Sequence, residues 1–148
     1  ESKLKAVAHS LQQDFGITNP RVAVLGLNPH SGDHGVIGKE EINTLVPLLQ
    51  SINIEKVEVN GPFSADAFFG SKSYKNYDAI LAMYHDQGLI PFKTLSFGQG
   101  VNFTAGLSVV RTSPDHGTAF AIAGKGEADP ESFAQAVQAA IEIVDRRT

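Results

Sequence analysis

Residues 79–111 read AILAMYHDQGLIPFKTLSFGQGVNFTAGLSVVR, and this stretch indicates both an α/β fold and the position of a site. Residues 79–84 form an uncharged apolar run, short enough for a buried strand, that stops at His85 and Asp86. In open α/β sheets, ligands bind at the carboxyl ends of the strands. Glycines and polar residues follow, with few helix formers. We therefore interpret the region after His85 as the floor of an active site.

A second buried strand is predicted over residues 21–27, RVAVLGL, which are apolar and β-branched and follow an Asn-Pro turn. This strand runs into NPHSGDHG at residues 28–35, so a histidine again follows the carboxyl end of a strand. His30 and His85 would then lie at the same edge of one sheet. A single loop histidine is usually solvated or bonded within its turn, but the pair favours a functional site.

Further helices and strands are predicted on either side of this pair of strands. Apolar residues recur at helical spacing in residues 1–15, 39–52 and 130–147, and Pro47 should kink the middle helix or shift its start. Glu40 and Glu41 lie in the first turn of that helix, where they complement its dipole. Short strands are predicted at residues 57–60, 100–106 and 107–112, and short helices at 65–69 and 118–123. The predicted buried stripe of the last helix is Phe133, Val137, Ile141 and Val144.

Composition limits the class of protein. The 148 residues are 42% hydrophobic and 19% charged, as in an ordinary globular domain. The net charge of −4, without a Lys/Arg cluster, argues against nucleic acid as the main partner. No apolar run approaches the roughly 20 residues of a membrane span, and no signal-peptide pattern is present. Because the chain has no cysteine, a transition-metal site must use His and carboxylate ligands. A cytoplasmic location is expected.

The two histidines predict a metal site. Two imidazoles at adjoining strand ends can hold a divalent cation, but two ligands do not complete a protein site. Asp86 is either a third ligand or a partner that orients His85. A metal held here would polarise a substrate hydroxyl or carbonyl. Lys93, Asn102 and Arg111 would position an anionic substrate beside it.

Six motifs resemble those of one family, the 4-hydroxythreonine-4-phosphate dehydrogenases of pyridoxal phosphate biosynthesis. They are NPHSGDHG, GKEE, NGPFSAD, AMYHDQGLIPFK, FGQGVNFTAGL and RTSPDHGTAFAIAGKGEAD. The resemblance covers nearly the whole chain. It implies a layered α/β/α fold with a mixed, largely parallel sheet, as in isocitrate and isopropylmalate dehydrogenases. Residues 1–148 would form a truncated C-terminal fragment of a two-lobe enzyme, with the crossover between lobes near residues 107–130.

The resemblance also implies roles for single residues. His30 and His85 match two of the family's three metal-binding histidines, and the third belongs to the N-terminal half. Lys93, Asn102 and Arg111 match substrate-binding positions. Lys93 and Asp86 are both candidates for the catalytic base. The positions of the cofactor loop are matched by His116, Gly117, Thr118, Ala119 and Asp129.

The implied reaction is the oxidation of 4-phosphooxy-threonine by NAD or NADP, assisted by zinc, cobalt or magnesium. The product then loses its carboxylate to give 3-amino-2-oxopropyl phosphate. The resemblance implies a homodimer with a shared active site, and we expect the chain alone to be inactive and to bind metal poorly. Two alternatives stay open. One is a dehydrogenase of a related phosphorylated hydroxy acid, such as phosphothreonate or phosphoerythronate, and the other is a non-catalytic module that binds phosphorylated metabolites.

Overall fold

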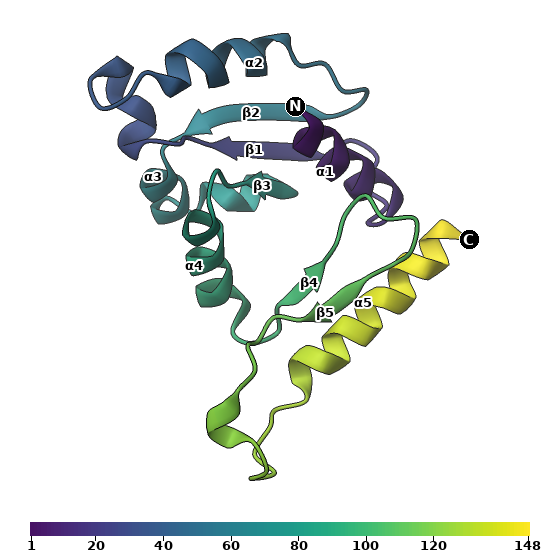
Figure 1. Ribbon diagram of the computed structural model, residues 1–148. Helices are drawn as coiled ribbons and strands as arrows, with labels where there is room; N and C mark the ends of the chain where they lie inside the picture. Colours follow the sequence, from purple (N-terminus) through teal and green to yellow (C-terminus); the bar gives the residue numbers. More distant parts are fainter.

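The structure, a computed structural model, describes residues 1–148 and is built around a three-stranded parallel sheet. Its strand order is β2-β1-β3, with β1 in the centre (Figure 1). Because the strands are parallel, their carboxyl ends lie at one edge of the sheet, as predicted for the two strands that precede histidines. In chain order, the strands and helices are α1 (Ser2–Gln13), β1 (Arg21–Leu25), α2 (Val46–Ser51), β2 (Glu58–Phe63), α3 (Ala65–Gly70), β3 (Ala79–Leu81), α4 (His85–Ser96), β4 (Val101–Phe103), β5 (Thr112–Pro114) and α5 (Glu131–Arg147).

Helices cover both faces of this sheet. Alternation along β1 points Val22 and Val24 to one face, where they pack with Leu4 and Leu11 of α1 and with apolar residues of α2. Ala23 and Leu25 point to the other face and pack against Phe68 of α3. Strand β1 is therefore buried on both sides, as a central parallel strand must be. The predicted α/β/α layering is confirmed.

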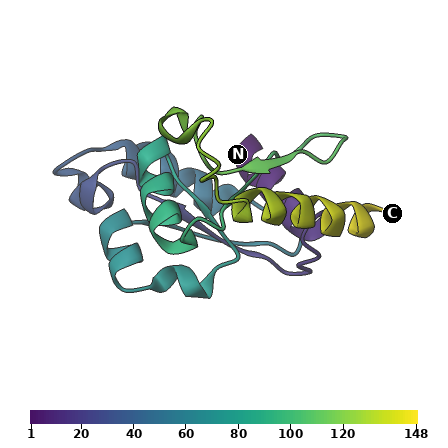
Figure 2. The ribbon, with the colours of Figure 1, turned by 90° about the horizontal axis from the view of Figure 1, so that it is seen from below.

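A second unit consists of β4, β5 and α5. The two strands pair antiparallel, and α5 lies along them (Figures 1 and 2). The helix buries Ser132, Ala136 and Ile143. The predicted buried stripe is wrong, because Phe133 is 63% exposed and Val137, Ile141 and Val144 are each about half exposed. The buried residues Ser132, Ala136 and Ile143 lie on the neighbouring face of α5, so the predicted stripe is left largely in solvent.

The chain buries little of its surface for its size. Only 18 of 148 residues are buried, and the accessible surface is 9460 Å². A compact monomer of 15.8 kDa would expose about 7,300 Å². The difference, about 2,000 Å², is the size of a large protein interface. The open face of α5 accounts for part of this surface, and it is available for further packing.

Residues 85–96 form helix α4 rather than the irregular active-site floor that the sequence predicted. The helix contains Pro91 and ends at Phe97, which has left-handed dihedrals. Gly88 gives it room beside the sheet, because a Cβ there would lie 3.0 Å from the Ala82 side chain. Tertiary packing thus overrides the low helix propensity of Gly88 and Pro91.

The remaining elements agree with the sequence to within a few residues, with three differences. The predicted helix over 39–52 is divided into a π turn, Glu41–Leu45, and α2, which has Pro47 in its first turn. Strand β3 ends at Leu81, before the predicted strand does. Strand β5 begins at Thr112, where the predicted strand ends, and it includes a proline at the edge of a sheet. None of the helices combines the length and hydropathy that a membrane-spanning segment needs.

A buried ion pair joins the first helix to the last. Asp14, which follows α1 and is 1% exposed, accepts a hydrogen bond from Arg147 Nε at 2.7 Å. Arg147 also donates to the Leu107 carbonyl oxygen at 3.2 Å. Burial alone would raise the pKa of the Asp14 carboxyl, but the hydrogen bond and charge of Arg147 outweigh burial and hold this pKa below its usual value. The sheet unit and the α5 unit are thereby connected.

Candidate active site

The ends of the three parallel strands are tied together by hydrogen bonds. The backbone N–H of Gly26, just after β1, donates to Phe63 O of β2 at 2.7 Å. The Gln87 side chain donates to Gly26 O at 2.7 Å and accepts from Met83 N at 2.8 Å, so it bridges the ends of β1 and β3. The segments that carry His30 and His85 therefore leave the sheet from adjoining points.

Acidic side chains accompany both histidines at this edge. Asp86 Oδ1 lies 2.8 Å from Nδ1 of His85. The pKa of the Asp66 carboxyl lies below its usual value. The largest cause is the hydrogen bond from the Ser64 hydroxyl, and the Ala67 N–H and the charge of His30 lower it further. Asp66 and Asp86 line the same cavity of about 480 Å³, between α3 and α4. His85 thus lies beside one aspartate of this cavity, and the charge of His30 acts on the other.

The donors at this edge suit a divalent metal but do not complete a site. Neutral imidazole is a common ligand of zinc and of related ions. However, no group of three or more His, Asp or Glu side chains is arranged to hold a metal ion. Asp86 Oδ1 lies within hydrogen-bond distance of His85 Nδ1, which is the geometry that an orienting partner needs. This edge can therefore supply two ligands of a larger site.

His30 is part of an unusual left-handed turn. All five residues 30–34 have positive φ, between 43° and 83°. Only one of them, Gly32, is a glycine, and left-handed dihedrals cost other residues roughly 1–2 kcal/mol each. The surrounding structure must therefore hold the turn in place. One brace is a hydrogen bond from the Ser31 hydroxyl to Pro62 O at 3.1 Å.

Glu41 provides a second brace for this turn and is only 2% exposed. Its carboxylate accepts hydrogen bonds from the backbone N of Asn28 at 2.7 Å and from Asn28 Nδ2 at 2.9 Å. Burial raises the pKa of the Glu41 carboxyl, but the hydrogen bonds from Asn28 outweigh burial, and the pKa lies below its usual value. The sequence predicts only a helix-dipole role for Glu41. A carboxylate beside a Gly-rich loop was the signal for its second role.

Replacing Gly32 by alanine is expected to lower the free energy of unfolding by about 2 kcal/mol. The added Cβ would lie 2.7 Å from Gly38 O and 2.8 Å from Glu41 Oε2, and φ at this position is +83°. Gly98→Ala is the matched control, because Gly98 has nearly the same φ, +84°, but no atom within 4 Å of the added Cβ. Denaturant unfolding of both variants measures the difference. Equal losses would mean that the turn has room for a side chain.

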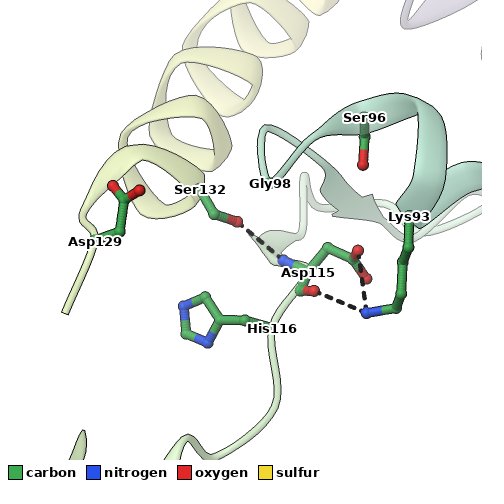
Figure 3. Close-up of a pocket in the computed structure, with 7 residues that line it drawn as sticks. All are labelled: Lys93, Ser96, Gly98, Asp115, His116, Asp129 and Ser132. Carbon is green, nitrogen blue, oxygen red and sulfur yellow. Dashed lines mark hydrogen bonds and ion pairs between the residues drawn. The ribbon is translucent and has the colours of Figure 1, made fainter.

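A polar cavity of about 290 Å³ lies near the other end of α4, and no hydrophobic residue lines it (Figure 3). Lys93 Nζ lies 3.4 Å from Asp115 Oδ2 and donates to Asp115 O at 3.2 Å. Ser132 accepts from Asp115 N at 3.1 Å and donates to Gly100 O at 3.1 Å, which fixes the start of α5 against both strands. The residues that line the cavity are Lys93, Ser96, Gly98, Asp115, His116, Asp129 and Ser132.

The profile of the family described as "Pyridoxal phosphate biosynthetic protein PdxA" matches residues 1–140. The chain belongs to the PdxA family. The resemblance seen in the six motifs is thereby confirmed.

Relatives of this PdxA family chain are named as dehydrogenases. The chain is 55% identical to a 4-hydroxythreonine-4-phosphate dehydrogenase of Prosthecochloris aestuarii. The alignment spans 138 residues, which are 93% of this chain and 40% of that relative. A crystal structure of the enzyme of that name from Burkholderia phymatum matches with a TM-score of 0.76 and 40% identity, over 96% of the chain and 43% of that structure. A crystal structure of a terephthalate 1,2-cis-dihydrodiol dehydrogenase from Burkholderia xenovorans matches with a TM-score of 0.69 and 30% identity. This match covers 95% of the chain and 46% of that structure.

The chain therefore spans less than half the length of the PdxA relatives that it matches. The structural matches confirm the predicted fold class, since these relatives share the fold over nearly all of the chain. The isocitrate dehydrogenase-like architecture that the motifs implied is that of this family.

Within the PdxA family chain, the predicted site residues fall into two groups. His30, in the turn after β1, and His85 and Asp86, at the start of α4, follow the carboxyl ends of parallel strands, whereas Lys93, His116 and Asp129 line the polar cavity. About 10 Å of helix rise along α4 separates Asp86 from Lys93. Four further residues line the polar cavity and were not predicted as site residues; the SPDHG turn and the polar start of α5 were the signals for two of them. The four are Ser96, Gly98, Asp115 and Ser132.

Five other predicted residues do not line the polar cavity. Asn102 pairs with Ser113 in the β4–β5 ladder and is exposed. Arg111 is also exposed, and its guanidinium donates to the Thr104 hydroxyl at 2.9 Å. The predicted loop residues Gly117, Thr118 and Ala119 continue from His116 into solvent. These five can reach a ligand only from outside the cavity.

Proposed function

We propose that this chain is the C-terminal part of a metal-assisted, NAD-dependent 4-hydroxythreonine-4-phosphate dehydrogenase. In this reaction, C3 of 4-phosphooxy-threonine gives a hydride to NAD, and its hydroxyl group gives up a proton. The resulting β-keto acid then loses its carboxylate as CO₂, leaving 3-amino-2-oxopropyl phosphate. The placement of His30 and His85 at adjoining ends of parallel strands carries the proposal, and the names of the relatives support the substrate.

His30 and His85 are the residues that would hold the metal. Imidazole suits zinc and cobalt, and magnesium suits the site if oxygen ligands join it. When bound, such an ion polarises the substrate hydroxyl and stabilises the negative charge that develops on its oxygen. Asp86, bonded to Nδ1 of His85, fixes the ring and leaves Nε2 as the nitrogen available to a ligand.

The cationic and polar residues would bind the anionic substrate. Arg111 offers a fork that suits phosphate or carboxylate, Lys93 offers a point charge, and Asn102 offers an amide. Lys93 and Asp86 are the two candidates to accept the hydroxyl proton. Because Asn102 and Arg111 lie outside the polar cavity, they would meet the substrate at a boundary with another part of the enzyme.

The polar cavity would bind the nicotinamide cofactor through His116 and Asp129, and the loop residues Gly117, Thr118 and Ala119 would contact the cofactor from outside the cavity. The carboxylate of Asp129 can accept a hydrogen bond from a ribose hydroxyl. The proposed cofactor is NAD, with NADP as the alternative.

Asp129→Asn and His116→Ala are each expected to raise the KM for NAD roughly tenfold, because each removes a polar contact to the cofactor. The kcat should change little, since neither residue lies with the two strand-end histidines. Steady-state kinetics of the full-length protein measure both constants. Glu127→Gln, on the same loop but outside the cavity wall, is the control. An unchanged KM in both cavity variants would place the cofactor elsewhere.

We further propose a two-lobe enzyme with the crossover between lobes near residues 107–130, and a homodimer that shares its active site. The separate β4–β5–α5 unit and the large open surface support this arrangement. A third metal ligand would come from the rest of the enzyme or from a partner subunit. The cytoplasm, where the nicotinamide cofactors are held, is the proposed location.

The 148-residue chain alone is expected to be inactive and to bind zinc much more weakly than the full-length protein does. Two imidazoles form an incomplete site, because protein zinc sites usually have three or four ligands. NADH formation and calorimetric titration with zinc compare the two proteins directly. Robust turnover by the isolated chain would contradict the proposal that essential groups lie outside it.

A panel of substrates tests the proposed reaction. The full-length protein is incubated with NAD and zinc, and NADH absorbance is followed with 4-phosphooxy-threonine, phosphothreonate or phosphoerythronate. The proposal predicts the highest kcat/KM with 4-phosphooxy-threonine, together with release of CO₂. Preference for either of the other two acids would favour the related dehydrogenase. Binding of all three without NADH formation would favour a non-catalytic phosphometabolite-binding module.

A further inference from the structure

We propose that Glu41 is a positioning residue that holds the left-handed turn of residues 30–34 in the conformation that presents His30 to the sheet edge. This inference rests on the proposed function in one respect, the assignment of His30 as a metal ligand. Glu41 has no assigned part in the proposed reaction. Its contacts connect it to the turn and to nothing else in the candidate site.

The Glu41 carboxylate contacts the turn at two points. Just before the turn, Glu41 Oε1 accepts a hydrogen bond from the Asn28 backbone N at 2.7 Å, and Glu41 Oε2 accepts one from Asn28 Nδ2 at 2.9 Å. In the middle of the turn, the carboxylate lies directly against Gly32, where a Cβ would be 2.8 Å from Oε2. One buried side chain therefore fixes the start of the turn and packs against its centre.

The chemistry of this position calls for a carboxylate. An ionised carboxylate only accepts hydrogen bonds, and both groups that face it from Asn28 are donors. A glutamine can offer one oxygen, but its NH₂ group would face another donor. Since Glu41 is 2% exposed, water cannot easily replace a lost bond. Glutamine should therefore fit the space and still loosen the turn.

The turn needs such support because its backbone conformation is strained. Residues 30–34 include four non-glycine residues with left-handed dihedrals, a conformation that L-residues do not keep without help. The Ser31 hydroxyl supplies one external bond, to Pro62 O at 3.1 Å. His30 is exposed, so the backbone of the turn sets the position of its ring. Loosening the turn would thus make the position of the His30 ring more variable, while His85 would stay fixed on α4.

The test compares Glu41→Gln with Glu40→Gln in the full-length protein. Glu40 is the matched control, because its carboxylate accepts from the same Asn28 Nδ2 at 2.8 Å but is exposed. Hydrogen exchange by mass spectrometry reports on peptides that cover residues 28–36 in the metal-free protein. Competition with a chelator measures zinc affinity, and kinetics give the KM for NAD.

Glu41→Gln is expected to speed exchange in the turn and to weaken zinc binding about 10- to 100-fold, as substitution of residues behind metal ligands usually does. Glu40→Gln should match the wild type in both. The KM for NAD should not change, because the polar cavity lies near the other end of α4. Exchange in the turn that is equal in the two variants, with equal zinc affinity, would overturn the proposal.

Two outcomes separate this inference from the proposed function. If zinc does not bind through His30 in the wild type, the proposed metal role fails, and exchange in the turn alone decides the role of Glu41. If Glu41→Gln does not fold, Asn28→Ala decides, since it removes the Nδ2 bonds and leaves the backbone N–H bond in place. Faster exchange in Asn28→Ala supports the proposal, and exchange at the wild-type rate overturns it.

Discussion

Replacing either His30 or His85 by alanine in the full-length protein is expected to lower kcat/KM by about 10³-fold or more. A metal that polarises the substrate oxygen contributes several kcal/mol to transition-state stabilisation, and each factor of ten in rate corresponds to about 1.4 kcal/mol. Because both rings would serve the same ion, losing the second should cost little once the first is gone. NADH formation and zinc titration of the two single variants and the double variant measure this.

The control for this experiment is His34→Ala. His34 lies in the same left-handed turn and is exposed, but it is not among the proposed metal ligands. Its variant should retain most of the activity and the zinc affinity. If His34→Ala loses as much activity as His30→Ala, the loss in both comes from disturbance of the turn. If His30→Ala and His85→Ala keep wild-type zinc affinity and turnover, neither ring binds the metal.

The second large effect is expected at the ion pair between the first and last helices. Arg147→Met removes the counter-charge of a carboxylate that is 1% exposed. A buried Asp14 carboxylate without a partner should cost about 3 kcal/mol of stability. The melting temperature should then fall by roughly 10 °C for a chain of this size. Arg146→Met is the matched control, because the Arg146 side chain is 41% exposed and makes longer contacts.

The same pair predicts a pH dependence. The pKa of Asp14 in the folded chain is below its value in the unfolded chain, because Arg147 stabilises the charged form. The pair therefore stabilises the fold in full above the unfolded pKa of about 4, and this contribution is lost as the pH falls through the lower, folded pKa. Melting curves between neutral pH and pH values of about 3 should show this loss. The Asp14→Asn variant should not show this acid-dependent loss of stability. If its melting temperature falls with pH in the same way as that of the wild type, the loss does not come from Asp14.

The parallel order of β1 and β3, the two strands that precede histidines, could be predicted because short-range patterns determine it. Residues 21–27 are apolar and β-branched, which matches a strand buried on both faces. Since parallel strands end at one edge, the positions of His30 and His85 followed from the strands alone. Both predictions needed only local sequence and a general rule of α/β sheets.

The remaining features depend on contacts between distant residues. Helix α4 forms despite Gly88 and Pro91, because packing on the sheet compensates for poor propensity. The exposed stripe of α5 cannot be distinguished from a buried stripe by its periodicity, because the pattern does not say what covers it. Glu41 looks like a helix-dipole residue until its contact with Asn28 is known.

The division of the site into two groups has the same origin. The sequence placed Lys93, Asn102 and Arg111 beside the metal, because all of them follow His85 along the chain. In the structure, α4 carries Lys93 away from the sheet edge to a polar cavity, and Asn102 and Arg111 lie on the β4–β5 unit. A substrate that meets all of these groups must therefore span parts of the molecule that only a complete active site would bring together.

The central claim is that His30 and His85 bind one metal ion. Crystals of the full-length protein grown with zinc, measured at the zinc absorption edge, test it most directly. The account predicts a single anomalous peak with a nitrogen of each ring at about 2.0–2.1 Å from it. A zinc ion bound by only one of these rings, or located away from both, would contradict the claim.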